Sequence, residues 1–250
     1  MRRLVAIGSG KGGVGKTWLA ISLSHAFAKL GFRTLLIDGD VGLANVDVQL
    51  GLTKGPNLGT ALLNERPIIS SIQSISALGV DVLAGRSGGE GLGGFDSHLA
   101  TRMVTELQSL RESYELIVLD LPSGIEAGMR RLMMTADDAV ILTTEEPTAL
   151  TDAYALMKAV RKHQPDLLPK TIVNLVESHQ SGQRTVEGLS RVCHRFLKID
   201  PTCLGMIRRD RRVVEAIGRQ TSLLQCNPNS KAAQDVSAIA ESIINRAPMR

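Results

Sequence analysis

Residues Gly10 to Thr17 combine the side-chain types and the spacing that bind phosphate groups. They read Gly-Lys-Gly-Gly-Val-Gly-Lys-Thr. Glycines let successive backbone N–H groups turn towards phosphate oxygens, and in such a loop Lys16 would meet the β and γ phosphates while Thr17 offers its hydroxyl to Mg²⁺. A second lysine, Lys11, directly follows the first glycine and is not part of the basic pattern. The motif predicts the following nucleotide-binding residues: Gly10, Lys11, Gly12, Gly13, Val14, Gly15, Lys16 and Thr17.

The segments on either side of this loop predict a strand and a helix. Leu4 to Ile7 is an apolar run, which is typical of a buried strand. Residues 17–30 place apolar side chains at helical spacing. A phosphate-binding loop needs this context, because the first N–H groups of the helix point at the phosphates. The alternative is a glycine-rich turn that contains lysines by chance, and the strand and helix argue against it.

Carboxylates that follow predicted strands supply the remaining chemistry. Asp38 ends the apolar run that starts at Thr34, Asp40 comes soon after it, and Asp120 ends the run that starts at Leu116. In an open parallel sheet the carboxyl ends of the strands flank the ligand crevice, so these acids would face the phosphates. We expect Asp120 to hold Mg²⁺ directly or through water, and Asp40 to orient the attacking water. Acids at strand ends also cap turns and helices, and for each acid alone that alternative stays open. The predicted metal site is Thr17, Asp38 and Asp120.

The rest of the chain alternates short apolar runs with helical patterns. Most of the runs are apolar throughout, which predicts strands buried on both faces of a mostly parallel sheet. This order indicates a doubly wound α/β fold with helices on both faces of the sheet. The expected strands cover residues 4–8, 34–38, 80–84, 116–120, 139–143, 171–176 and 203–207. The clearest helices cover residues 98–111, 150–163, 186–196 and 232–245.

Length and composition bound the class of protein. The chain has 250 residues, 43% of them hydrophobic, which suffices for one large core, and we expect a single domain over residues 1–250. The 3 cysteines lack a Cys-x-x-Cys spacing, which argues against a disulfide framework or a zinc site. No apolar stretch reaches the length of a membrane span, so we expect a cytoplasmic protein. Glycine is dense over residues 85–95, which predicts a surface loop.

Two features leave a contact with nucleic acid or with a membrane open. The chain carries a net charge of +4, and its densest basic cluster lies at residues 208–212. Such a cluster would bind DNA phosphates without sequence preference, although a solvated surface partly neutralised by Asp210 is the favoured interpretation. The expected C-terminal helix, residues 231–246, has an apolar stripe that would suit a membrane surface. Its polar face has few cations, which favours packing on the core instead.

Several of these segments together resemble a known family. The loop with its extra lysine, the turn Asp38-Gly-Asp40 and the segment Asp120-Leu-Pro-Ser-Gly124 resemble the deviant Walker A motif and the two switch segments of the MinD/ParA family of ATPases. Residues 42–52 and 146–158 resemble its FlhG/FleN branch, which controls the number and placement of bacterial flagella. The similarity covers essentially the whole chain.

The resemblance implies a MinD-like P-loop NTPase of the SIMIBI class that binds ATP and Mg²⁺ and hydrolyses ATP slowly, with stimulation by a partner. Two copies would sandwich ATP, because Lys11 of each would reach phosphates held by the other. Hydrolysis would then release the dimer. The implied catalytic residues are Lys11, Lys16 and Asp40, and the implied adenine side comprises Asn174, Arg208 and Asp210.

Two positions depart from the family pattern. Trp18 stands where the family normally has a small hydroxyl residue that helps to hold the α-phosphate, and Arg208 stands where it usually has proline. These departures keep a nucleotide-sensing module with negligible hydrolysis open as an alternative. A ParA-like ATPase that partitions DNA or another cargo is a second alternative. The implied partners are a second copy in ATP and a flagellar regulator, either a transcription activator, an FlhF-type GTPase or a switch protein, with polar or transient membrane localisation.

Overall fold

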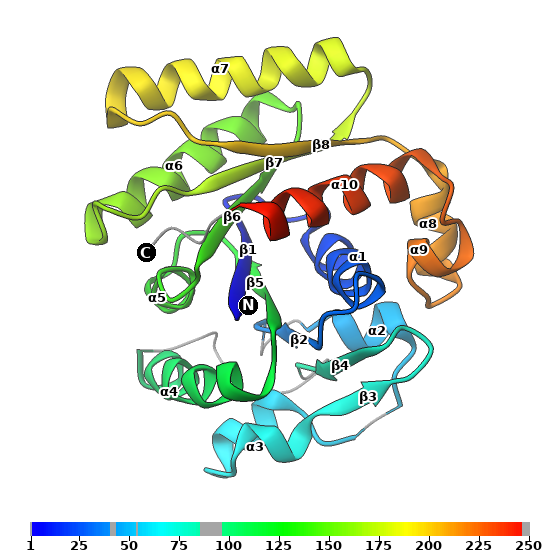
Figure 1. Ribbon diagram of the computed structural model, residues 1–250. Coiled ribbons are helices and arrows are strands. Elements are labelled where there is room, and N and C mark those ends of the chain that lie inside the picture. Colours follow the sequence, from blue (N-terminus) through cyan, green and yellow to red (C-terminus); the bar gives the residue numbers. More distant parts are fainter. Residues whose placement is uncertain (1, 41–43, 54, 86–96, 247–250) are drawn as a thin grey trace.

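The computed structural model describes residues 2–40, 44–53, 55–85 and 97–246. The glycine-rich loop expected over residues 85–95 therefore lies outside the described residues except for Gly85. In the described part of the chain, a single eight-stranded sheet forms the centre of the molecule, in the order β3-β4-β2-β5-β1-β6-β7-β8 (Figure 1). The strands are β1 (Arg3–Ser9), β2 (Thr34–Asp38), β3 (Gln73–Ile75), β4 (Val80–Leu83), β5 (Leu116–Ser123), β6 (Asp138–Thr143), β7 (Lys170–Val176) and β8 (Cys203–Arg208).

Helices cover both faces of the sheet, as Figure 1 shows. The longer ones are α1 (Lys16–Lys29) and α10 (Lys231–Asn245) on one face, and α4 (Ser97–Ser113), α5 (Ala127–Met133), α6 (Pro147–His163) and α7 (His179–Leu197) on the other. Short helices connect them: α2 (Val46–Leu50), α3 (Leu58–Leu63), the 3₁₀ turn η1 (Ile68–Ser71), α8 (Arg211–Gly218) and α9 (Leu223–Cys226). The expected doubly wound, mostly parallel fold is confirmed.

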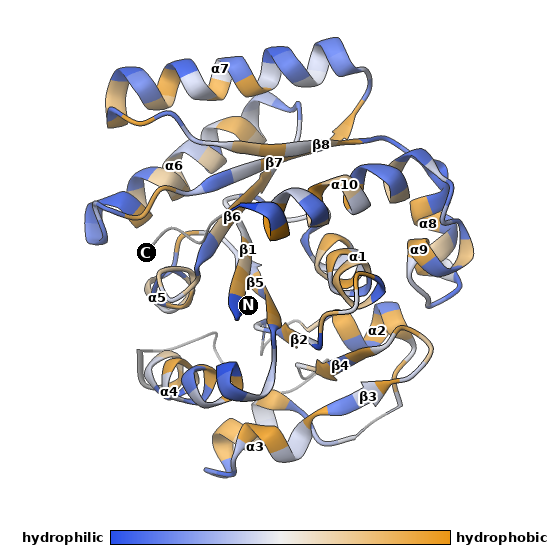
Figure 2. Ribbon diagram, viewed as in Figure 1, coloured by the Kyte–Doolittle hydropathy of each residue, from blue (hydrophilic) through white to orange (hydrophobic). Residues whose placement is uncertain are grey.

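The apolar runs of the strands are explained by the two cores that they separate. Val5 and Ile7 of β1 belong to the core under α1 and α10, whereas Leu4 and Ala6 belong to the core under α4 to α7. Successive side chains of a strand point to opposite faces, so a strand covered on both faces must be apolar at every position. Figure 2 shows this pattern: the central strands are hydrophobic, while the outer surface of α7 is hydrophilic.

The elements that the sequence did not indicate are short. β3 has 3 residues, is partly exposed and pairs antiparallel with β4 at the edge of the sheet, so it carries no apolar run. The helices α2, α3, α5, α8 and α9 were also not predicted, because they are too short to show a helical period.

The C-terminal helix lies against the core. Val236, Ile239 and Ile243 of α10 are buried in the same core as α1, and α10 contacts both α1 and β8. This placement agrees with the packing interpretation of its apolar stripe, because a stripe that covers the core is not available to a membrane in this conformation.

Candidate nucleotide-binding site

The phosphate-binding loop joins β1 to α1 at the carboxyl edge of the sheet. Gly15 has a φ of 94°, a left-handed conformation that favours glycine, and α1 begins at the next residue, Lys16. Gly10 approaches α6 so closely that a Cβ there would clash with the backbone of Asp152. The backbone N–H groups of the first turn of α1 have no partner within the helix, which makes this end suitable for phosphate.

A cavity of about 450 Å³ lies at this loop. The sequence-predicted residues Lys16, Thr17, Asp38, Asp40 and Asp120 all line it. The fold therefore brings the loop and the strand-end carboxylates together, as predicted from the order of the strands. Residues that were not predicted also line it: Asn45, Gln49, Leu121, Ser123 and Ile217.

Asp120 carries the least compensated charge of the cavity. It is a register partner of Asp38 on the neighbouring strand, and it is buried. Burial, and next the charge of Asp38, raise the pKa of Asp120 to about 8, against the opposing effects of the Thr17 hydroxyl and Lys16. Its Oδ1 atom is buried and has no hydrogen-bond partner among the described residues. A buried, unpaired carboxylate oxygen beside a threonine hydroxyl fits the oxygen ligands that Mg²⁺ prefers.

Asp38 has a different set of contacts. Its carboxylate accepts hydrogen bonds of 3.0 Å from the backbone N–H groups of Asp40, Asn45 and Val46. These bonds tie Asp40 and the start of α2 to the end of β2. Burial nevertheless raises the pKa of Asp38 to about 6, and the backbone hydrogen bonds oppose that shift. Asp38 thus links the end of β2 to the start of α2 in this structure, and a role towards Mg²⁺ stays a prediction.

Lys16 is bound by a residue that sequence reasoning missed. Its Nζ donates to the Ser9 hydroxyl at 2.8 Å, and that hydroxyl donates to the carbonyl of Lys11 at 2.6 Å. Burial lowers the pKa of Lys16, while the charges of Asp120 and Asp40 act in the opposite direction. The position of Ser9, directly before the first glycine of the loop, was the available signal.

Lys11 contacts its own chain. Its Nζ donates to Glu146 Oε2 at 2.5 Å and to Thr148 Oγ1 at 3.0 Å. Glu146 precedes α6 and Thr148 lies in its first turn. The side chain of Lys11 is 37% exposed, so it lies at the rim of the site and not deep in the loop. Lys11 also lowers the pKa of the Glu146 carboxyl, first by its hydrogen bond and next by its charge.

The residues expected on the adenine side have contacts of their own. The Asn174 amide donates to the carbonyl of Val14 at 2.8 Å and so supports the phosphate-binding loop. Arg208 pairs with Asp235 of α10 at 2.7 Å. Asp210 accepts from the backbone N–H of Arg212 at 3.0 Å and caps α8. The fold brings Asn174 to the loop, whereas Arg208 is held by α10; binding of a base by these residues stays a prediction.

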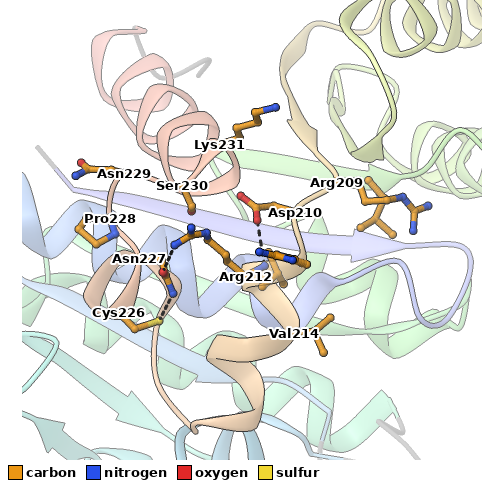
Figure 3. Close-up of a pocket in the computed structure, with 13 residues that line it drawn as sticks. Arg209, Asp210, Arg212, Val214, Cys226, Asn227, Pro228, Asn229, Ser230 and Lys231 are labelled. Atoms are coloured by element: carbon orange, nitrogen blue, oxygen red, sulfur yellow. Dashed lines mark hydrogen bonds between the residues drawn. The ribbon is translucent and has the colours of Figure 1, made fainter.

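A second cavity, of about 990 Å³, lies between the start of α8 and the start of α10 (Figure 3). Arg212 reaches across it to Asn227 at 2.7 Å. Its cationic side chains are Arg209, Arg211, Arg212 and Lys231. Arg209 pairs with Glu177 at 2.6 Å, whereas no ion pair involves Arg211 or Lys231 within the described residues. Residues 209–212 of the basic cluster therefore line a cavity, and Arg208 does not.

Resident metal ions and membrane spans each need a particular arrangement of residues. Among the described residues, no group of three or more His, Cys, Asp or Glu is arranged to hold a metal ion by itself. None of the helices in the described ranges is long and apolar enough to cross a membrane.

Comparison with known proteins identifies the family. Residues 5–223 match the model of the CobQ/CobB/MinD/ParA nucleotide-binding domain. The chain belongs to this family. Members of the MinD/ParA family are ATPases, and the matched residues include the phosphate-binding loop and the carboxylates of Asp38 and Asp120.

Relatives of this MinD/ParA-family chain include flagellar and cell-division proteins. The antiactivator FleN of Pseudomonas aeruginosa is 30% identical over 241 residues, which cover 96% of this chain and 86% of FleN. The flagellum site-determining protein YlxH of Helicobacter pylori is 30% identical, over 98% of this chain and 82% of YlxH. The cell-division ATPase MinD of Pyrococcus furiosus has the same fold, with a TM-score of 0.81 at 24% identity over 99% of this chain and 100% of that one.

Proposed function

We propose that this chain is an ATP-hydrolysing molecular switch that dimerises when ATP is bound and that regulates the number or placement of flagella. The observation that carries the switch is Lys11. This lysine lies at the rim of the phosphate-binding loop and is held by Glu146 and Thr148 of its own chain. A cation held by an exposed carboxylate and a hydroxyl can exchange these partners for phosphate at small cost, because exposed ion pairs contribute little.

The chemistry is positioning and charge neutralisation. Mg²⁺, when bound with ATP, would neutralise charge on the β and γ phosphates; Thr17 and Asp120 would hold it, partly through water, with Asp38 beside them. Lys16 would leave Ser9 for the phosphates. Asp40 would orient the attacking water. A Mg-ADP complex is known for the related MinD of Pyrococcus horikoshii, which shares the fold at a TM-score of 0.80 and 24% identity over 98% of this chain and 97% of that one.

Slow hydrolysis is part of this proposal. Lys11 would complete the site only after it has left Glu146, and only when a second copy is present. A partner that stabilises the dimer would then raise the rate. Trp18 motivates the alternative, a nucleotide-sensing module with negligible turnover. That alternative gains support if phosphate release by the unaltered chain equals that of Lys16→Ala.

The switch is tested by the mass in solution of Asp40→Ala, measured by light scattering with Mg²⁺ and either ATP or ADP. We expect a dimer in ATP and a monomer in ADP, because this variant would bind ATP but not hydrolyse it. Lys16→Ala should remain monomeric in both, and Lys11→Ala should lose the dimer while keeping most of its nucleotide affinity. A monomer with ATP bound in Asp40→Ala would overturn the switch.

The flagellar role is supported by the two relatives that are named for it, FleN and YlxH. Deleting the gene and counting flagella per cell tests it, with complementation by the unaltered gene and by Lys16→Ala. An altered number or position, restored only by the unaltered gene, is expected. Unchanged flagella would contradict the role. If the flagella do change, co-purification with the ATP-locked variant Asp40→Ala would identify the partner. We expect a transcription activator, an FlhF-type GTPase or a switch protein.

The basic cavity favours a second candidate, a ParA-like ATPase that binds DNA. Arg211 and Arg212 line this cavity at the start of α8. ATP-dependent retention of bulk DNA that weakens with salt and is lost in Arg211→Ala with Arg212→Ala would support this candidate. Arg184→Ala with Arg191→Ala removes the same charge from the exposed surface of α7 and is the matched control. Equal loss in both double variants would indicate a general charge effect.

A further inference from the structure

The end of β8 is tied to α10 by a two-point ion pair. The Arg208 guanidinium donates from Nε to Asp235 Oδ2 at 2.9 Å and from Nη2 to Asp235 Oδ1 at 2.7 Å. The backbone N–H of Arg208 donates to the same carboxylate at 2.9 Å. The Asp235 side chain is only 15% exposed. A guanidinium and a carboxylate that meet at two points fix their relative orientation as well as their distance, so this pair holds Arg208 in one position on α10.

A second tie between the same segments runs through Asp210, two residues further along the chain. Its carboxylate accepts from the backbone N–H of Arg212 at 3.0 Å, which caps α8, and from the backbone N–H of Ala232 at 3.3 Å, in the first turn of α10. Asp210 therefore lies between the starts of the two helices (Figure 3). Arg208 Nη2 also donates to the Lys231 carbonyl at 3.3 Å. Because Arg208 is held at α10, the chain that follows it brings Asp210 within reach of both helices.

The helix that Asp210 caps has little apolar packing of its own. Among the residues of α8, Ala216 is buried, whereas Val214 is 72% exposed and both Val213 and Ile217 are only partly buried. A helix this short gains most of its stability from tertiary contacts. Since its apolar contacts are few, the position of α8 depends on the polar ties at its start.

α8 reaches from one cavity to the other. Its first residues, Arg211 and Arg212, line the basic cavity, and Ile217 near its end lines the cavity of the phosphate-binding loop. α8 also contacts α2, whose Gln49 lines the cavity of the loop as well. A displacement of α8 would therefore change one wall of the nucleotide-binding cavity. The phosphate-binding loop itself joins β1 to α1, and the hydrogen bonds of Arg208 with Asp235 and Lys231 do not involve it.

We infer that Arg208 is a positioning residue of the nucleotide site: through Asp235 and Asp210 it fixes α8 at the cavity, and it does not itself contact the nucleotide. The inference rests on the proposed nucleotide-binding function. It replaces the expected direct contact of Arg208 with a base by an indirect role, because the guanidinium is already engaged by Asp235. It also makes α10 part of the support of the nucleotide site.

Calorimetric titration with Mg²⁺ and either ADP or pyrophosphate tests this inference without turnover. Arg208→Ala should bind ADP about tenfold more weakly, which corresponds to the loss of one hydrogen bond to a charged group. Pyrophosphate would occupy the loop alone, so its affinity should stay within about twofold. Asp235→Ala should weaken ADP binding by the same factor. The double variant should bind ADP no more weakly than either single variant, because both changes break the same pair.

The matched control is Arg111→Ala. Arg111 also pairs with a partly exposed aspartate, Asp137, at 2.8 Å and donates to a backbone carbonyl, that of Thr135, at 2.8 Å, but it lines neither cavity. Its replacement should lower the urea midpoint of unfolding about as much as Arg208→Ala does and leave the ADP affinity unchanged. If Arg208→Ala does not fold, weaker ADP binding by Asp235→Asn decides the question. Its amide oxygen can still accept from the backbone N–H of Arg208, while the charge of the pair is lost.

The contradicting outcomes are distinct. An unchanged ADP affinity in Arg208→Ala, beside a lowered unfolding midpoint, makes the pair merely structural; it overturns this inference and leaves the proposed function intact. Equal losses of affinity for ADP and pyrophosphate also overturn it, because the effect would then include the loop. Losses that add in the double variant overturn it as well, since Arg208 would then act without Asp235. A chain that binds no adenine nucleotide overturns the proposed function, and the inference with it.

Discussion

The two edges of the central sheet each bury a cluster of charged side chains, and the two clusters differ in how well their charges are balanced. At the amino edge, Arg3 and Lys170 both pair with Asp138; all are buried, and Arg3 Nε lies 3.2 Å from Asp138 Oδ2. At the carboxyl edge, the buried acids Asp38 and Asp120 are neighbours on adjacent strands, and the cation that acts on Asp120 is the half-buried Lys16.

The amino-edge cluster ties distant parts of the chain together. Arg3 starts β1, Asp138 starts β6 and Lys170 starts β7. The Arg3 guanidinium also donates to the backbone carbonyls of Ile243 and Arg246 at the end of α10. Helix carboxyl ends carry partial negative charge, which helps to balance the second cation. This cluster serves the fold.

The carboxyl-edge cluster leaves charge uncompensated. The pKa of Asp120 is raised to about 8 and that of Asp38 to about 6, so both acids are destabilised in their charged forms. Binding of a cation such as Mg²⁺ would therefore stabilise the charged forms of both acids. The comparison teaches that one chain can bury charge for stability at one edge and keep it unsatisfied for binding at the other.

The largest effect is expected at the amino edge. Asp138→Asn should lower the free energy of unfolding by about 3–5 kcal/mol, because two buried cations, Arg3 and Lys170, lose the carboxylate with which both pair. Urea unfolding measures the loss. Asp200→Asn, which breaks the exposed contact of His194 with Asp200, is the control and should cost less than about 0.5 kcal/mol. Similar values for the two variants would remove the distinction between the clusters.

The opposite sign is expected at the carboxyl edge. Asp120→Asn should raise the free energy of unfolding of the nucleotide-free protein by about 1–2 kcal/mol at pH 8, because the neutral amide removes the repulsion with Asp38. The same variant should lose Mg²⁺-dependent nucleotide binding. Urea unfolding and titration with Mg-ADP measure the two effects. If Asp120→Asn destabilises the nucleotide-free protein, the repulsion between Asp38 and Asp120 does not reduce its stability as described.

The dependence on pH follows from the same groups. The pKa values of Asp38 and Asp120 rise from 3.8 in the unfolded chain to about 6 and about 8 in the folded one. The folded protein therefore binds more protons, and their contribution to stability is fully present below pH 4 and is lost as the pH rises through 6 and 8. For each proton, the free energy of unfolding decreases by at most about 1.4 kcal/mol per pH unit. Between pH 6.5 and 8.5, the free energy of unfolding should decrease less steeply with pH in Asp120→Asn than in the wild-type protein. A wild-type free energy of unfolding that increases over that range contradicts the prediction.

The smallest effect concerns the support of the phosphate-binding loop. Asn174→Ala removes the hydrogen bond to the Val14 carbonyl and should lower the free energy of unfolding by about 1 kcal/mol. We expect weaker nucleotide binding as well, because Gly15 and its neighbours lose a contact that holds the loop. Thermal unfolding and titration with ADP measure both. An unchanged nucleotide affinity would show that the loop keeps its shape without Asn174.

Much of the architecture could be predicted from local patterns. The apolar runs located most of the parallel strands, since burial on both faces leaves a continuous signature. The loop between residues 10 and 17 and the acids at the strand ends are likewise predictable from residue types and spacing alone. β3 and α5 were missed, because a polar edge strand of 3 residues and a helix of 7 residues carry too little periodicity.

The sequence by itself determined which residues can bind phosphate and which strands carry the acids, because glycine conformations and apolar periods are local properties. The tertiary structure decided their partners. Lys11 meets Glu146 135 residues away, and Asn174 meets Val14 160 residues away. The pairing of Asp38 with Asp120 and that of Arg208 with Asp235 likewise depend on strand order and helix packing. These are contacts between segments distant in the sequence, and no local pattern encodes which of them will meet.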